Sequence, residues 1–142
     1  MTYELVGGDL PLRLPGTFKP WAIEVGHSKV LLRGLLGGED GGRPRMFDVL
    51  FQDVSRISLS DRYTDLGVRT ADPETMRAEE RRVGGSWRGS RLFLLSEGNP
   101  CDYVVAGYLF WAEVNVFPGE RSPLLEESPQ PGSIVENRVF RV

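Results

Sequence analysis

The side chains that could support chemistry are few, and nothing in the sequence brings them together. The single histidine, His27, adjoins Ser28, and this is the one place where a nucleophile lies beside a base. Neighbours in sequence on a turn rarely point at each other, and a catalytic triad also needs an orienting carboxylate. The serines near glycines, Ser86 and Ser90, do not form the GxSxG pattern of a nucleophile elbow. We therefore predict that the protein is not an enzyme.

Metal and phosphate sites also lack their usual patterns. A zinc site built around the one histidine and the one cysteine, Cys101, would have to recruit carboxylates, and Asp48, Asp53 and Glu113 do not have ligand spacing. The glycine-rich segment 37–44 ends in Arg-Pro, where a phosphate-binding loop needs Lys followed by Ser or Thr. The sequence therefore predicts no metal and no cofactor.

The longest run of strand-forming residues, 102–117, carries the polar side chains of greatest interest. From Tyr108 onward, alternate side chains belong to opposite faces of a strand. One face is wholly apolar or aromatic and is expected to point at a core. The other face mixes apolar and polar residues, which suggests partial cover by a neighbouring element or a partner. Its polar residues either look at solvent or belong to an exposed concave binding surface. Trp87, in a glycine-rich loop, is either a core residue or an interface anchor. The candidate binding residues are Leu109, Trp111, Glu113, Asn115 and Trp87.

Length and composition indicate one ordinary domain. With 142 residues, the chain can bury a core without disulfides, and its single cysteine permits no intrachain bridge. The first residues lack the basic start and apolar stretch of a secretory signal. No apolar run approaches the roughly 18 residues that a membrane-spanning helix needs. These features predict a cytoplasmic protein without membrane contact.

The net charge bears on the class of partner. The formal charge is −3, which argues against nucleic acid because that affinity comes mainly from neutralised phosphates. Net acidity favours a basic protein partner through electrostatic steering.

Short apolar runs separated by turn residues predict the fold. Residues 21–36 are typical of a hairpin with His27 at its tip. Asp72-Pro73-Glu74 predicts a helix start, with the helix continuing over 73–82, although poor amphipathicity leaves a mobile loop as the alternative. Further strands are expected at 46–51, 54–59, 65–70, 91–96, 102–117 and 133–142. The fold class is mainly β: an antiparallel sandwich or open barrel of about eight or nine short strands, with at most one peripheral helix near 73–82.

The chain is expected to form a single domain, 1–142. Residues 1–19 are predicted to be an irregular arm with short extended pieces, and 37–45 a flexible glycine-rich hairpin loop. Residues 118–132 contain prolines and are expected to be a crossing segment outside the sheet. Gly107 is expected to mark a bend, a bulge or a close backbone approach that divides the run from 102 to 117 into two strands.

Three functions remain open from the sequence. The first is a non-enzymatic protein-binding domain. A small acidic β domain with aromatic-rich strands is similar in type to bacterial immunity proteins that neutralise toxins, although no motif is shared. The second is a barrel or sandwich that binds a small molecule, or a weak enzyme, with Glu113 or His27 placing the ligand. The third is a structural subunit that forms a homo-oligomer through an exposed edge strand such as 133–142.

Overall fold

The computed structural model describes residues 3–36, 45–96 and 102–142. Within them the protein is mainly β, as predicted, with eight strands and one α-helix. The strands are β1 (Glu4–Gly7), β2 (Leu12–Glu24), β3 (Lys29–Leu35), β4 (Met46–Ser58), β5 (Tyr63–Thr70), β6 (Arg91–Leu95), β7 (Tyr103–Val114) and β8 (Arg138–Arg141). The α-helix is α1 (Pro73–Val83), and three short 3-10 helices are η1 (Val25–His27), η2 (Pro123–Leu125) and η3 (Val135–Asn137).

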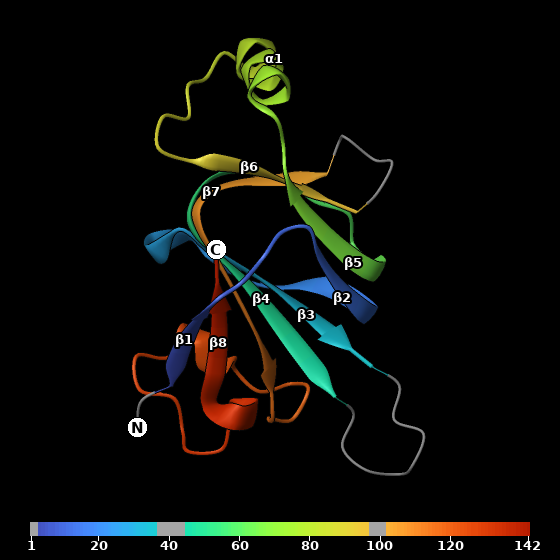
Figure 1. Ribbon diagram of the computed structural model, residues 1–142, viewed down its shortest axis with the longest axis vertical. Helices are drawn as coiled ribbons and strands as arrows, with labels where there is room; N and C mark the ends of the chain where they lie inside the picture. The colour runs from blue at the N-terminus through green and yellow to red at the C-terminus, as the bar shows by residue number, and fades with distance from the viewer. Residues whose placement is uncertain (1–2, 37–44, 97–101) are drawn as a thin grey trace.

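The strands form one sheet that closes into a six-stranded barrel. The strand order is β1-β8-β7-β4-β3-β2-β5-β6, and β6 pairs with the first part of β7 to close the barrel. The second part of β7 pairs instead with β8, and β8 pairs in parallel with β1. Figure 1 shows the barrel in the middle of the molecule, with α1 beyond β6 at one end. Strand β7 therefore connects the barrel to the β8–β1 extension.

Side chains fill the inside of the barrel. Inward-facing residues alternate along each strand and come from all six barrel strands, as the 2.0-residue period of a strand requires. The most deeply buried residues of this core are Phe18, Leu32, Val49, Phe51, Leu66, Val68, Phe93, Leu95, Val104, Ala106 and Leu109. The rings of Phe51 and Phe93 pack near its centre, with centroids 5.6 Å apart.

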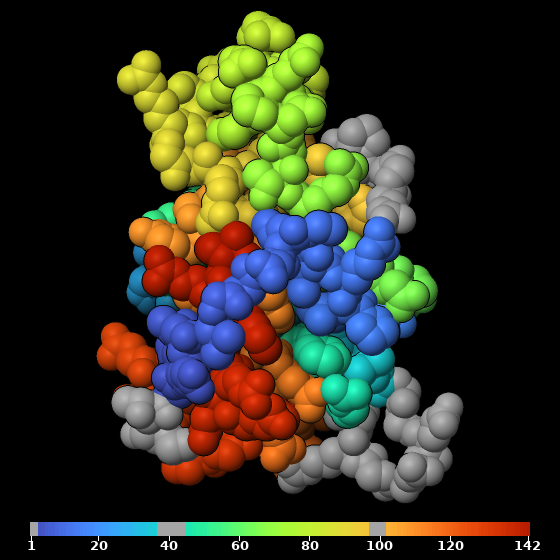
Figure 2. Space-filling model, in the orientation of Figure 1, coloured from blue at the N-terminus to red at the C-terminus, as the bar shows by residue number. Residues whose placement is uncertain are grey.

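The segment after β7 covers part of the outside of the barrel. Residues 118–132 contain η2, and Leu125 of η2 packs with the buried Leu31 and Leu50 on β3 and β4. Ile134 packs with Ala112 and Val114 on β7. Figure 2 shows the orange and red residues of this segment gathered at the end of the molecule opposite the green α1. The chain after β7 therefore folds back and covers the apolar outer face of this strand.

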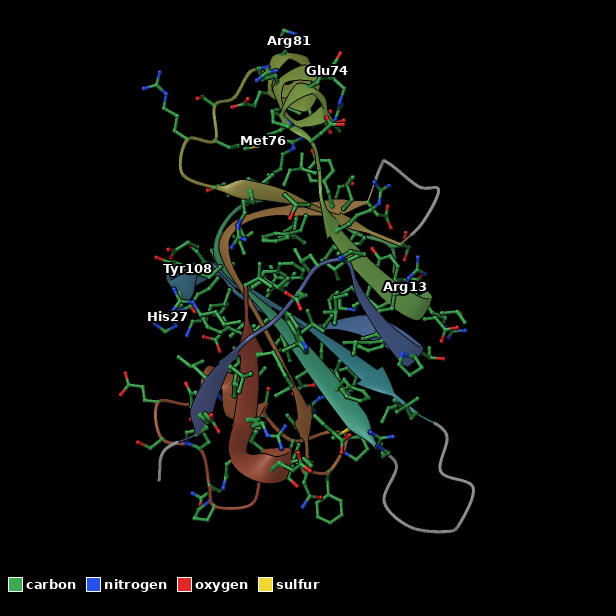
Figure 3. All side chains as sticks on the ribbon, in the orientation of Figure 1. Arg13, His27, Glu74, Met76, Arg81 and Tyr108 are labelled. Atoms are coloured by element: carbon green, nitrogen blue, oxygen red, sulfur yellow. The ribbon has the colours of Figure 1, made fainter. Side chains whose placement is uncertain are left out.

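Helix α1 forms as predicted. Asp72 accepts a hydrogen bond from the Thr75 amide at 2.7 Å, Pro73 occupies the first turn, and the helix ends at Gly84. Figure 3 shows Met76 on the side of α1 that faces β6 and Arg81 on the opposite side. Met76 packs against a small core that includes Trp87 and Leu92. The hairpin over 21–36 is also confirmed, as β2, η1 and β3.

The expectation of an irregular arm over 1–19 is wrong. Strand β1 and the first half of β2 lie there, and Leu12, Leu14 and Phe18 point into the core. Pro15 and Gly16, which suggested a turn, lie at a shift of register between β2 and β5, where Gly16 has a positive φ of 112°. They form an irregularity within a continuous strand rather than its end.

Three further expectations about strands need correction. Residues 46–51 and 54–58 belong to one strand, β4, whose register with β7 shifts between Val54 and Arg56. Strand β7 runs through Gly107 without a break, so the expected division of the run is wrong. A Cβ at Gly107 would lie 3.2 Å from the Asp53 Cβ, so the missing side chain makes room for the close approach of Asp53, which has a φ of 55°. The C-terminal strand β8 lies between β1 and β7, so it is not an exposed edge.

Candidate functional site

The three apolar candidate residues are packed in cores. Leu109 is 0% exposed inside the barrel, and Trp111 is buried beside it, stacked on Phe140 at 5.7 Å between ring centroids. Trp87 is buried under α1, with its ring centroid 6.5 Å from that of Tyr103. Leu109 and Trp111 therefore do not line an exposed concave surface, and Trp87 is a core residue, the first of its two expected roles.

The apolar face of β7 points at a core, as expected, and the mixed face is covered as well. The mixed face carries Leu109 and Trp111 into the barrel, and the apolar face carries Ala112 and Val114 against the segment that follows β7. Both faces are covered, so alternation could identify two faces without indicating which one enters the barrel.

Glu113 forms an ion pair with Arg45 near the surface. Arg45 Nε lies 3.0 Å from Glu113 Oε1, and the Arg45 guanidinium also lies over the Phe47 ring at 5.5 Å. The Glu113 side chain keeps 22% of its area exposed. It is thus a charged residue at the end of the barrel, next to the surface described below.

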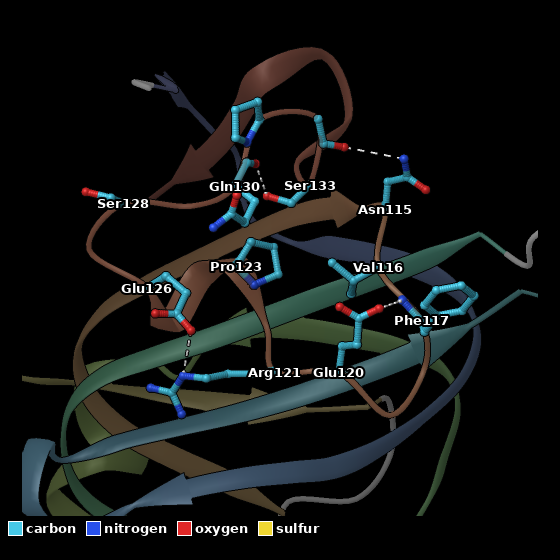
Figure 4. Close-up of a pocket in the computed structure, with 12 residues that line it drawn as sticks. Asn115, Val116, Phe117, Glu120, Arg121, Pro123, Glu126, Ser128, Gln130 and Ser133 are labelled. Carbon is cyan, nitrogen blue, oxygen red and sulfur yellow. Dashed lines mark hydrogen bonds and ion pairs between the residues drawn. The ribbon is translucent and has the colours of Figure 1, made fainter.

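Of the two polar candidates, Asn115 lines an open hollow of about 630 Å³, whereas Glu113 lies outside it. Asn115 lies at its edge, where its Nδ2 donates to the Gly132 carbonyl at 3.4 Å and its backbone amide to the Ser133 carbonyl at 2.7 Å. Figure 4 shows the hollow between the end of β7 and the loop that contains Ser128 and Gln130. We call the β7-end surface the set Asn115, Phe117, Glu120, Arg121, Glu126 and Gln130, all of which line the hollow.

Carboxylates and an exposed aromatic ring dominate this surface. Phe117 is 58% exposed, although it is large and apolar. Glu120 Oε1 accepts from the Phe117 amide at 2.9 Å, which fixes this carboxylate beside the ring. Glu126 Oε1 lies 2.9 Å from Arg121 Nε. Arg121 also reaches Glu24 at 2.6 Å, so its charge is shared between two carboxylates. The pKa of Glu24 is lowered, first by the hydrogen bond with His27 and then by the one from Arg121.

A buried ion pair holds the β7-end surface to the barrel. Arg33 Nε and Nη2 each lie 2.8 Å from the Asp48 carboxylate, and both side chains are almost completely buried. Arg33 Nη1 donates to the carbonyls of Pro118 at 2.8 Å and of Glu120 at 2.6 Å. The guanidinium thus has a carboxylate on one side and two carbonyl acceptors on the other, as a buried charge requires. The loop from Phe117 to Glu120 is consequently anchored by side chains of β3 and β4.

Other polar clusters have structural explanations. His27 Nδ1 lies 2.9 Å from Glu24 Oε2 on an exposed turn. The one histidine is therefore bonded to a carboxylate, and it does not line the hollow of the β7-end surface. Asp102 accepts from Tyr63 Oη at 2.8 Å and from Ser60 Oγ at 2.5 Å. Burial raises the pKa of Tyr63 to about 12, with further contributions from Asp102. This second cluster, in which Asp102 accepts both hydroxyl hydrogen bonds, closes the turn before β5.

Residues 3–36, 45–96 and 102–142 contain no group of three or more His, Cys, Asp or Glu side chains that could hold a metal ion. In the same residues, no helix is long and apolar enough to cross a membrane. Cys101 and most of the glycine-rich loop 37–45 lie outside the described part of the chain.

Sequence reasoning missed Phe117, Glu120, Glu126 and the Arg33–Asp48 pair as parts of the site. Arg33 and Asp48 did carry a signal, because each is the one charge in its apolar run, 30–36 or 46–51, and the two runs belong to consecutive strands. Opposite charges in such positions are expected to meet across a hairpin. Glu120 and Glu126 lie in an irregular segment, where no periodicity indicates a direction.

Comparisons with known proteins do not identify this chain. A scan against protein families, a search of curated proteins and a search of solved structures each found no match.

Proposed function

We propose that the protein is a non-enzymatic binding domain that holds a basic protein partner at the β7-end surface. The observation that carries this proposal is the open hollow of about 630 Å³, which is rimmed by Glu120 and Glu126 and lies beside the exposed ring of Phe117.

The chemistry of the hollow suits a cationic side chain. Carboxylates of Glu120 and Glu126 and the amide oxygens of Asn115 and Gln130 are acceptors for a lysine or an arginine of the partner. The face of Phe117 offers a cation–π contact to the same group. An exposed aromatic side chain within a polar rim is a common arrangement at binding hot spots.

The loop also has the rigidity that binding requires. Arg33 anchors the carbonyls of Pro118 and Glu120 to a buried ion pair, so Phe117 and Glu120 are held before a partner arrives. Preorganisation of this kind reduces the entropy lost on association. An immunity role, in which the partner is a basic toxin, is the most specific version of the proposal.

A small-molecule function receives less support. The barrel is the usual place for such a ligand, and here it is filled by side chains such as Phe51, Phe93 and Leu109, each 0% exposed. A homo-oligomer formed through β8 is also disfavoured, because β8 already has strands on both sides.

The test compares variants of this surface against a partner obtained by co-expression with the product of the adjacent gene or by capture from the native host. Phe117→Ala is expected to weaken binding at least tenfold, because it removes the aromatic anchor. Glu120→Gln combined with Glu126→Gln is expected to weaken it by a similar factor and to reduce its dependence on salt, because the shape is kept while two charges are removed. Isothermal titration at two salt concentrations measures both effects.

The matched control removes two carboxylates elsewhere. Glu74→Gln combined with Asp61→Asn changes the net charge equally, and both residues are exposed and lie outside the hollow. The control is expected to bind almost as tightly as the wild type. Equal losses in both double variants would mean that only the net charge matters, and unchanged affinity after Phe117→Ala would place the partner on another surface.

A further inference from the structure

Strand β1 is the last strand of the sheet, and in the described residues it pairs with β8 alone. Figure 1 shows β1 to the left of β8, with the barrel strands on the other side of β8. The Arg141 carbonyl accepts from the Gly8 amide at 2.9 Å, so Gly8 and, two residues earlier, Val6 direct their backbone groups at β8. Leu5 and Gly7 alternate with them, so their amides and carbonyls point away from the sheet. Such groups are what a further strand needs for pairing.

The free edge of β1 lacks the protection that another edge of the same sheet has. Beyond Phe18, β2 pairs only with β3 in the described residues. That stretch carries Lys19 and Pro20 and a shift of register, which are features that keep edge strands from pairing with another chain. Residues 3–8 contain no proline, lysine or arginine, and β1 keeps one register with β8. Glu4 is their only charge, so β1 remains open to strand addition.

The side chains of β1 also leave apolar area uncovered. Leu5 lies opposite Val139 of β8, which is buried in a core with Ala112 and Val114 of β7. Tyr3, two residues before Leu5, belongs to the same face. Leu5 is 51% exposed and Tyr3 is 40% exposed. The apolar face of β7 and β8 therefore continues onto β1 and ends there without cover.

The sequence of β1 is complementary to itself in one antiparallel register. With a two-fold axis at Leu5, the outward backbone groups of Leu5 pair with those of Leu5 in a second copy. Tyr3 then lies opposite Gly7, where its ring can cover the glycine, and Glu4 lies opposite Val6. A shift of two residues in one direction would place Glu4 opposite Glu4, which is unfavourable, and a shift in the other direction would leave Tyr3 unpaired.

From these observations we infer that two copies of the chain associate through the free edges of β1, which pair antiparallel across a two-fold axis at Leu5 and join the two sheets. The contact uses the same edge of both copies, so the assembly closes at a dimer. Only residues 3–7 of each copy pair, so the interface lies at the small end of the range and the dimer depends on concentration. It uses none of the residues of the β7-end surface and is independent of the proposed function.

Sedimentation equilibrium over a hundredfold range of protein concentration tests the association. The average mass of the wild type is expected to rise from that of a monomer towards that of a dimer. Leu5→Pro removes an amide that β8 does not use, and Leu5→Lys places two like charges opposite each other, so each is expected to raise the dissociation constant at least tenfold. Val25→Lys adds the same charge at a side chain that is 85% exposed in η1, and it is expected to leave association unchanged.

Crosslinking tests the register. In a Cys101→Ser background, Leu5→Cys is expected to form a disulfide-linked dimer on oxidation, because Cα atoms of a hydrogen-bonded antiparallel pair lie about 5.5 Å apart. Glu4→Cys, whose copies are offset by two residues, is expected to crosslink at least tenfold less. A monomer at every concentration, undiminished association of both Leu5 variants, or equal crosslinking at the two positions would overturn the inference. Melting temperatures close to that of the wild type show that the variants keep the fold.

Discussion

Replacement of Asp48 by alanine is expected to lower the free energy of unfolding by about 3–5 kcal/mol, because it leaves the Arg33 guanidinium buried without its counter-charge. Both side chains are almost completely inaccessible to water. Arg33 could reach solvent only by breaking its hydrogen bonds to the Pro118 and Glu120 carbonyls. Urea unfolding of the wild type and the variant, followed by tryptophan fluorescence, measures the difference.

A double variant separates the charge from the shape. Arg33→Met combined with Asp48→Leu removes both charges and keeps similar volume, so it is expected to be clearly more stable than Asp48→Ala alone. It also removes the donor to the carbonyls of Pro118 and Glu120, so the β7-end surface is expected to bind its partner more weakly even where stability returns. A cost below 1 kcal/mol for Asp48→Ala would contradict the account of this pair.

The second large effect is expected in the barrel. Phe51→Ala should destabilise the fold by about 3–5 kcal/mol, through the lost transfer free energy and the cavity that remains. The Phe51 ring is 0% exposed and contacts Phe93 at the centre of the core. The variant is also expected to bind benzene in the new cavity, as detected by NMR of the ligand, whereas the wild type is expected to bind none.

Phe117→Ala is the matched control, since it removes the same ring from the surface. Its expected effect on stability is within about 0.5 kcal/mol, because Phe117 is mostly exposed. If Phe51→Ala cost as little as Phe117→Ala, or if the wild type bound benzene inside the barrel, the interior would not be filled as described. The small-molecule function would then regain support.

Local signals in the sequence were sufficient to predict the elements whose ends carry a helix cap or a tight turn. Asp72 and Pro73 predicted the start of α1, and the alternation around His27 predicted the β2–β3 hairpin, because caps and tight turns depend on a few adjacent residues. The class of fold followed from the number and spacing of such strands.

The candidate site was harder to predict because it depends on contacts between distant residues. Trp111 looked like part of a half-exposed face, but the barrel covers one side of β7 and the C-terminal segment covers the other. The alternation of residue types along a strand separates its two faces, but it does not show which face is covered. Glu120 and Phe117 come together with Gln130 only because Arg33 and Asp48, far away in sequence, fix the loop between them.

The arm over residues 1–19 failed as a prediction for a different reason. Its prolines and glycines suggested turns, whereas the tertiary pairing of β2 with β5 accommodates Pro15 and Gly16 in an irregular part of one strand. Pairing partners that are far apart in the sequence can override a local preference, particularly at edges and bulges.

The most direct test of the proposed function is an amide chemical-shift map of the isotope-labelled protein, recorded with and without its purified partner. The account predicts that the largest changes fall on the amides from Asn115 to Ser133 and on Glu113, and that the barrel core changes little. Changes concentrated on the barrel core, or on residues remote from the hollow, would contradict it.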